Sequence, residues 1–398
     1  MGKIFRVCIS NGFHSCEELE LPARDYELLD MAERLQLEPG QKTELEILSY
    51  PDSFSYLEKC IAELPDLYQL NALARRLDEV NETDTRAMAV FEGLVGMNMQ
   101  KGELPIPLLS LIDFAYSADC CYVEEDADTD YKLGRFLAEN GFLPGAQELS
   151  DEAIELLDFA QIGKTHRELE GSVLTSFGYV EQHSEVHPVS KTMDFLPRQP
   201  DYAILLEVSK GSFDDAGYDS GKNVKLKLPA SQEKLDNVLE AVEAWDWREV
   251  GWSCLDCCAP ALADIISDTE EGIDFLNQMA QGLADLEPQA LTAYKALLEA
   301  TDCKDLRSAE TLMDSLDNYI FSPRYSSPIE VAKGELSVVL CAEAVETLTP
   351  HLNLYSYGQA LIEKCGGVLT PYGLIEREDH QPVLSAENMP RQGGMEMK

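Results

Sequence analysis

The chain has few cations for its size. It holds 31 Lys and Arg residues against 73 Asp and Glu residues, a formal net charge of −42, and it has six His residues. A molecule this acidic is repelled by nucleic acid and by anionic lipid, so we expect it to bind neither. Its charged partners are expected to be basic protein surfaces.

The sequence also lacks long apolar runs and catalytic motifs. No segment approaches the roughly 18 apolar residues that a membrane span requires. No Gly-rich phosphate loop, nucleophile elbow or kinase signature is present. We therefore expect a protein that is not an enzyme and uses no cofactor. Eleven cysteines without an apolar signal segment favour a reducing cytoplasm over a disulfide framework.

Two clusters have the residue types of a metal site without its spacing. Cys254-x-x-Cys257-Cys258 could form half of a zinc site, but no second cysteine pair has that spacing. The segment HSEVH at residues 183–187 is not the HExxH of a zinc hydrolase, and it lies in a polar linker. We interpret the cysteines as core residues on a helix and the histidines as exposed, and we expect no metal.

Several blocks recur along the chain in the same order. Residues 70–92 align without a gap with residues 276–298, and both have the apolar spacing of an amphipathic helical hairpin. Further blocks pair residues 21–23 with 228–230, 131–139 with 355–363, and 173–181 with 368–376. These repeats predict two related halves.

The pattern predicts an α+β fold in which each half has an α/β piece, a helical hairpin and a mixed C-terminal piece. We expect an elongated molecule with domains at 1–60, 61–118 and 119–200, corresponding domains at 201–265, 266–325 and 326–382, and a disordered tail at 383–398. Ser150 is expected to cap a helix that places Asp151, Glu155 and Asp158 on one face. The segment 336–347 fits a strand or a buried helix.

The acidic residues admit two interpretations. They could be a charged coat that keeps the fold soluble, or they could imitate phosphates. B-form DNA carries one charge per ~1.7 Å, so 42 charges correspond to about 70 Å of duplex. One helix face offers a carboxylate every ~5.4 Å, which is sparser than the ~3.4 Å between phosphates of one strand. Mimicry therefore requires acids pooled from neighbouring helices and loops.

Four motifs resemble the antirestriction protein ArdA family. These are LNxxAxxL in the helical hairpin, YKLGRFLAENGFLP (131–144), LLDFAQIGKTH (156–166) and VLTSFGYVE (173–181), which follow one another across residues 55–182. The resemblance implies an acidic protein carried on conjugative elements. Such proteins imitate bent B-form DNA and occupy the DNA-binding groove of type I restriction–modification enzymes. This chain departs from the family in its N-terminal region and in being about twice as long, so one chain could carry both arms of a dimer, and we leave monomer and homodimer open.

The residues expected to imitate phosphates are surface acids in both halves. They are Asp78, Glu79, Glu82, Asp84, Glu124, Glu125, Asp126, Asp128, Asp130, Asp151, Glu155, Asp158, Glu270, Glu271, Asp274, Asp285 and Glu287. The alternative function is an acidic adaptor that binds a basic protein of the host or of a mobile element without imitating DNA.

Overall fold

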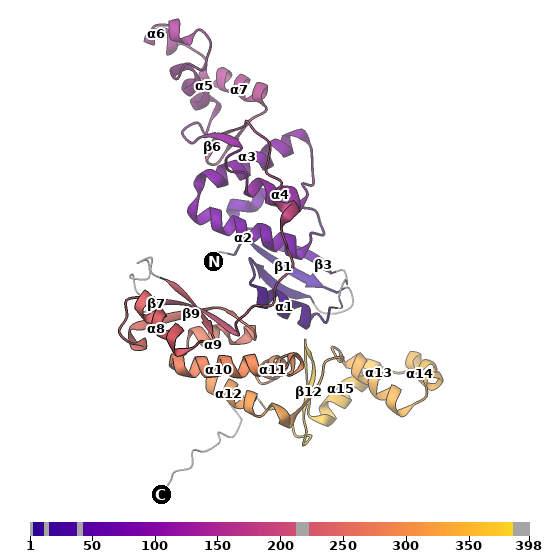
Figure 1. Cartoon of the computed structure of the whole chain (residues 1–398). Coiled ribbons are helices and arrows are strands. Elements are labelled where there is room, and N and C mark those ends of the chain that lie inside the picture. Colours follow the sequence, from indigo (N-terminus) through magenta and orange to yellow (C-terminus); the bar gives the residue numbers. More distant parts are fainter. Residues whose placement is uncertain (1–2, 12–15, 38–42, 212–222, 385–398) are drawn as a thin grey trace. The chain divides into compact units, whose positions relative to one another are not determined.

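A computed structural model describes residues 3–11, 16–37, 43–211 and 223–384 (Figure 1). Helices and small antiparallel sheets form a mixed α+β fold, which confirms the predicted class. The chain divides into two compact units: unit 1 is residues 1–23 with 42–197, and unit 2 is residues 24–41 with 198–398. Of the predicted tail, all but residues 383 and 384 lies outside the described residues.

Unit 1 contains two three-stranded antiparallel sheets separated in sequence by helices. The first sheet has the order β2-β1-β3, with β1 (Phe5–Ser10), β2 (Glu17–Leu21) and β3 (Glu44–Ser49). It is followed by η1 (Asp52–Lys59), α2 (Leu67–Thr83), α3 (Thr85–Lys101) and α4 (Leu108–Ala115). The second sheet has the order β4-β6-β5, with β4 (Cys121–Glu124), β5 (Val173–Thr175) and β6 (Gly178–Gln182). Between β4 and β5 the chain forms α5 (Asp130–Glu139), α6 (Asp151–Ile154) and α7 (Phe159–Glu170).

Unit 2 contains α1 (Asp25–Arg34) and two further three-stranded sheets. The sheet of order β8-β7-β9 is formed by β7 (Ile204–Lys210), β8 (Val224–Leu228) and β9 (Val250–Cys257). The helices that accompany it are α8 (Gln232–Ala241), α9 (Ala263–Ser267), α10 (Ile273–Asp285), α11 (Pro288–Ala300) and α12 (Leu306–Asp314). The sheet of order β10-β12-β11 is formed by β10 (Tyr319–Ser322), β11 (Val368–Thr370) and β12 (Gly373–Arg377). Helices α13 (Pro328–Val339), α14 (Ala342–Leu348) and α15 (Leu354–Cys365) lie between β10 and β11 in sequence.

Local sequence explains the helical hairpin. The apolar residues at the 3-4-3 spacing of α2 are fully buried, with Leu70, Leu73 and Leu77 each at 0% exposure. Asp84 ends α2 and also caps α3, because its carboxylate accepts a hydrogen bond from the Ala87 N–H at 2.9 Å. One residue therefore both terminates the first helix and starts the second.

Helix α1 belongs to unit 2 because its acids bind a buried lysine there. The Lys295 Nζ on α11 lies 2.9 Å from carboxylate oxygens of both Asp30 and Glu33. The Tyr372 hydroxyl donates to Asp30 at 3.0 Å. Asp30 and Lys295 are 6% and 4% exposed, so the pair is shielded from water.

Two of the recurring blocks touch each other in both units. The Asn71 side chain accepts from the Ala23 N–H at 2.7 Å and donates to the Ala23 carbonyl at 3.1 Å. The Asn277 side chain makes the same two bonds to Ala230, at 2.7 and 3.0 Å. An asparagine of the helical hairpin thus satisfies the backbone just after the second strand of the sheet. The order of strands and helices from β1 to β6 also resembles the order from β7 to β12. That the two halves are related stays a prediction.

The structure corrects several expectations about individual elements. Strands β2, β9 and β10 were not predicted, and Cys254 and Cys257 lie on β9 rather than on a helix. The segment 336–347 agrees with the helical alternative, since it spans the end of α13 and most of α14, but it is mostly exposed rather than buried. The matched Tyr131 and Tyr355 blocks occupy different positions in the order of elements, on α5 and on α15. Helix period and strand alternation are both weak in these short segments.

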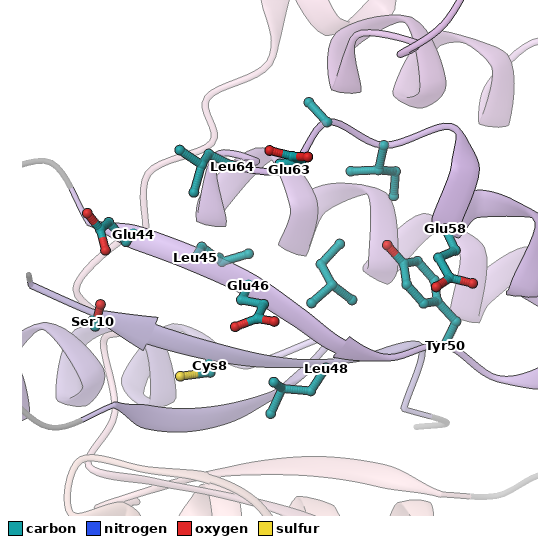
Figure 2. A pocket seen from close by; sticks show the side chains of 13 residues that line it. Cys8, Ser10, Glu44, Leu45, Glu46, Leu48, Tyr50, Glu58, Glu63 and Leu64 are labelled. Carbon is teal, nitrogen blue, oxygen red and sulfur yellow. The ribbon is translucent and has the colours of Figure 1, made fainter.

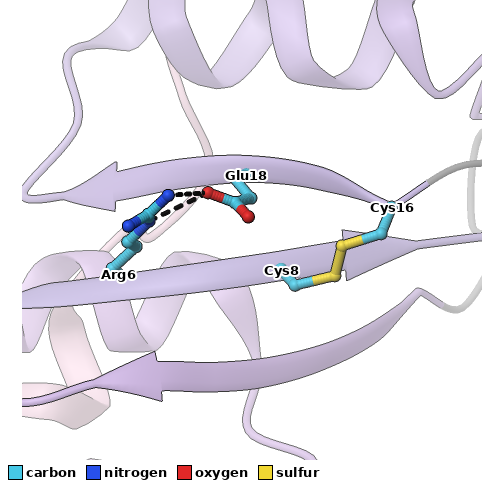
Figure 3. The surroundings of a disulfide bond; sticks show 4 residues. All are labelled: Arg6, Cys8, Cys16 and Glu18. Carbon is cyan, nitrogen blue, oxygen red and sulfur yellow. Dashed lines mark hydrogen bonds and ion pairs between the residues drawn. A yellow bond between two sulfur atoms is a disulfide. The ribbon is translucent and has the colours of Figure 1, made fainter.

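One disulfide was not expected from the cysteine content. Cys8 on β1 is bonded to Cys16, with Cα atoms 5.7 Å apart, and the other nine cysteines are free (Figure 3). The bond lies beside the β1–β2 ladder, where Arg6 and Glu18 also form an ion pair. Among the described helices, none combines the length and the apolar character needed to cross a bilayer.

We predict that Asn71→Ala lowers the free energy of unfolding by about 2 kcal/mol, because it leaves the buried Ala23 N–H without its acceptor. Chemical denaturation followed by circular dichroism measures the change. Asn140→Ala is the control, since Asn140 is exposed and bonds only to the carbonyl of its own helix, so its cost should stay within about 0.5 kcal/mol. Equal losses of unfolding free energy in the two variants would contradict a stabilising role for the Asn71 hydrogen bonds.

Candidate acidic interaction surface

The predicted acids are densest in one part of unit 1. Residues 119–182, here called the acidic module, contain fifteen Asp and Glu and four Lys and Arg, a net charge of −11. The module is the β4-β6-β5 sheet together with α5, α6 and α7. A quarter of the net charge of the chain therefore lies in about a sixth of its residues.

Two glycines let the helices of the acidic module approach closely. A Cβ atom on Gly134 of α5 would collide with the carbonyl of Phe159, and one on Gly163 of α7 would collide with the carbonyl of Asp130. Both glycines have negative φ, so the requirement is for space rather than for an unusual backbone. Because the backbones touch here, the acids at the start of α5 and along α7 are held on neighbouring surfaces.

All four cations of the acidic module are paired with its own acids. Arg167 binds both carboxylate oxygens of Asp130, at 2.9 and 3.2 Å, and these hydrogen bonds raise the pKa of the guanidinium. Arg135 bridges Glu139 at 2.6 Å and Glu155 at 3.1 Å. The two lysines complete the set as Lys132 with Asp128 and Lys164 with Glu168. No cation of the module remains to neutralise the other acids.

The loop after β4 carries exposed acids, as predicted. Glu125, Asp126 and Asp128 are exposed, whereas Glu124 and Asp130 are half-buried. Glu124 accepts a hydrogen bond from the Tyr122 hydroxyl at 2.8 Å. Glu125 and Asp126 have no side-chain hydrogen bond or ion pair within the described residues, so their full charge faces solvent.

The predicted single face of Asp151, Glu155 and Asp158 is wrong. Ser150 does cap the helix, accepting from the Ala153 N–H at 3.4 Å, but α6 ends at Ile154. Asp158 instead caps α7, accepting from the Gln161 N–H at 3.1 Å. All three acids are nevertheless exposed. The leucines at 156 and 157 suggested a continuing helix, and the strong cap at Asp158 starts a new one.

The acids predicted on the helical hairpin are mostly structural. Asp78 is 8% exposed and so is not a surface charge, which corrects that prediction. Glu79 is exposed and pairs with Arg76 at 2.9 Å, and the exposed Asp84 caps α3. Glu82 lies within α2, and its side chain is outside the described ones.

In unit 2 the predicted acids lie around α10. Glu270, Asp274, Asp285 and Glu287 are exposed, and the half-buried Glu271 binds Arg307 through both carboxylate oxygens at 2.6 and 2.7 Å. Asp274 lies in the first turn of α10, where the helix dipole favours it. These acids do not form a patch as dense as the acidic module.

The part of unit 2 that occupies the place of the acidic module in the element order is much less acidic. Residues 317–377, here called the second module, contain seven Asp and Glu and four Lys and Arg, a net charge of −3. Its surface also exposes apolar side chains, including Val338 at 78% and Val339 at 67%. Charge therefore distinguishes the two modules.

Sequence reasoning missed seven further acids of the acidic module. Glu181 on β6 is half-buried. The other six are exposed and lie just before β4, on the helices and on the loop between α5 and α6: Asp119, Glu139, Glu148, Glu152, Glu168 and Glu170. A sliding window of net charge would have included them, because the signal is the local excess of acids rather than any one motif.

The cysteine cluster in unit 2 forms part of a core. Cys257 and Cys258 are 1% and 3% exposed, and no group of metal-ligating residues occurs in the described residues. Asp256 lies beside them, 3% exposed, and accepts a hydrogen bond from the Tyr202 hydroxyl at 2.8 Å. Burial raises the pKa of Asp256 to about 6, and the Tyr202 hydrogen bond opposes that shift.

The second candidate metal cluster is also dispersed. His183 and Glu185 are exposed, whereas His187 contacts Asp119 at 2.8 Å, and this contact lowers the pKa of Asp119. The imidazole thus has a carboxylate partner within unit 1.

No protein-family model matches this chain, and no curated protein matches it. The resemblance to the ArdA family therefore rests on the motifs in the sequence.

We predict that Asp256→Asn stabilises unit 2 increasingly as the pH rises from 4 to about 6.5. The folded-state pKa of Asp256 lies above its unfolded value, so the folded state holds more protons in this range and loses stability with rising pH. The substitution removes that titration and keeps an acceptor for Tyr202. The stability difference should reach roughly 2–3 kcal/mol at neutral pH, measured by denaturation at a series of pH values. If the difference in unfolding free energy between the variant and the parent does not change with pH, a raised pKa of Asp256 is contradicted.

Proposed function

We propose that the chain is an antirestriction protein that imitates B-form DNA and occupies the DNA-binding groove of a type I restriction–modification enzyme. The observation that carries this proposal is the acidic module, in which the cations are paired internally and most of the remaining acids are exposed. The ArdA-like motifs lie in the same part of the chain, at residues 131–144, 156–166 and 173–181. Charge and motif therefore support one assignment.

The charge density is suitable for imitating a short duplex. At one charge per ~1.7 Å, the net −11 of the acidic module matches about 19 Å of B-form DNA. The acids come from the loop after β4, from α5, from α6 and from α7, so they are pooled from several elements, as the spacing on a single helix requires. A groove lined with Lys and Arg would bind such a surface by the forces that hold phosphates, releasing counterions.

In this account the second module contributes less to binding, because its net charge is −3. Inhibition would be stoichiometric, since the protein acts by occupying the groove and performs no chemical step. Many weak contacts would share the binding energy, in contrast to a site that depends on one residue.

We predict that reversing three unpaired acids of the acidic module, Glu125→Lys, Asp126→Lys and Asp151→Lys together, weakens binding to a type I methyltransferase at least about tenfold. Each single Ala substitution should change the dissociation constant less than about twofold, because exposed charges contribute little alone. Isothermal titration calorimetry at fixed ionic strength gives both values.

The matched control is Glu343→Lys, Glu346→Lys and Glu363→Lys in the second module, which changes the net charge equally on three exposed residues. This variant should stay within about threefold of the parent. Equal losses from both triple variants would mean that overall charge alone drives association, as expected of a non-mimetic acidic adaptor. A large loss from one conservative Asp→Asn change would instead indicate a specific site.

A further inference from the structure

A groove runs along the free edge of strand β3 in unit 1 (Figure 2). In the β2-β1-β3 sheet, β3 is an edge strand, and its strand partner among the described residues is β1. The groove has a volume of about 590 Å³, within the range of ligand sites. Its lining includes Glu46 and Leu48 from one face of β3 and Leu45 from the other, so it follows the edge of the strand. It also extends over the sheet to Cys8 and Ser10, the β1 residues that pair with Glu46 and Glu44.

The opposite wall of the groove is the segment that follows η1. Figure 2 shows Glu63 and Leu64 across from β3. Ile61 anchors this segment, because it is 8% exposed and its N–H donates to the Leu57 carbonyl at 3.0 Å. Leu64 is 72% exposed and Leu48 is 43% exposed, so each wall offers an apolar side chain to an incoming molecule.

The backbone of β3 has unused hydrogen-bonding capacity. Alternate residues of an edge strand direct N–H and C=O groups away from the sheet, where an added strand can bind them. Within the described residues, the backbone bonds of β3 are those to β1. Six residues of strand span about 20 Å, which is enough for an extended segment to form several main-chain bonds.

The charge of the groove determines which segment fits. Glu44, Glu46, Glu58 and Glu63 line it, no Lys or Arg does, and none of the four pairs with a cation in the described part of the chain. A second copy of β3 would bring its own glutamates against these and would be repelled. An extended segment with Lys or Arg on one face and apolar side chains on the other complements both the charge and the two exposed leucines.

We propose that β3 and residues 58–64 form a binding site for an extended, basic peptide segment of a partner protein, which adds to the sheet as a fourth strand. The site lies outside the acidic module, so the proposal does not rest on DNA mimicry. The main-chain bonds supply affinity regardless of side chain, and the glutamates select basic sequences.

The test is a fluorescence anisotropy titration of the full chain with a labelled eight-residue peptide of alternating Lys and Val. We expect saturable binding, and we expect hydrogen exchange at residues 44–49 to slow when the peptide is bound. A peptide with N-methyl groups on alternate residues cannot donate along one edge, so it should bind about tenfold more weakly to the unaltered protein. Equal binding of the two peptides would overturn the strand-addition proposal.

A pair of protein variants tests the position of the site. Glu46→Lys with Glu63→Lys should weaken peptide binding about tenfold or more. Glu103→Lys with Glu343→Lys changes the net charge equally on exposed residues outside the groove and should stay within about twofold. Equal losses from both pairs would mean that the peptide is attracted by the overall negative charge, and this would contradict a site on β3. Circular dichroism verifies that each variant is folded.

Discussion

Repulsion among like charges is the constraint on which the rest of this structure depends. With 73 acids and 31 basic residues, the folded chain concentrates negative charge that an unfolded chain would spread out. Several of its few cations are placed where they hold elements together. Arg167 ties α7 to Asp130 at the start of α5, Arg307 on α12 binds Glu271 just before α10, and the buried Lys295 holds α1 in unit 2. These cations thus secure the scaffold and leave many exposed acids without a cation partner in the described residues.

Much of the scaffold could be predicted from the sequence because its signals are local. Amphipathic spacing identified the hairpins of α2 with α3 and of α10 with α11. The recurrence of Leu-Pro-Ala and of Leu-Asn also proved informative, since Ala23 binds Asn71 and Ala230 binds Asn277 in the folded chain. Two short blocks that recur at similar spacing can therefore indicate a pair of residues that contact each other in the fold.

The parts that could not be predicted depend on contacts distant in sequence. The sequence near α1 does not indicate that this helix packs in unit 2. Asp30 has the pattern of an ordinary surface acid on a helix, and only the fold shows that it binds Lys295. Strand β9 was expected to be helical, because small apolar residues such as Cys254 and Cys257 fit the core side of a helix as well as that of a strand. The burial of Asp78 could have been anticipated, since it lies one helical turn after the buried Ala74 on the apolar side of α2. The acids themselves were identified by type, but their structural roles as caps and ion-pair partners became evident only from the fold.

A dense acidic surface and the ArdA-like motifs lie in the same residues of this chain. Either one alone would be weak, because acidic coats also serve solubility. The acidic module differs from the second module in net charge, −11 against −3, although both contain a three-stranded sheet and the helices between its strands. Because of that difference, we propose the binding role for this surface rather than for the acidic composition of the whole chain.

The most direct measurement is competition at equilibrium between this protein and a labelled DNA duplex for a purified type I methyltransferase. If the acidic module occupies the DNA-binding groove, the protein displaces the duplex fully, and raising the duplex concentration shifts the displacement curve in proportion. If protein and duplex bind the methyltransferase together, or if the protein does not bind it at all, the account is contradicted.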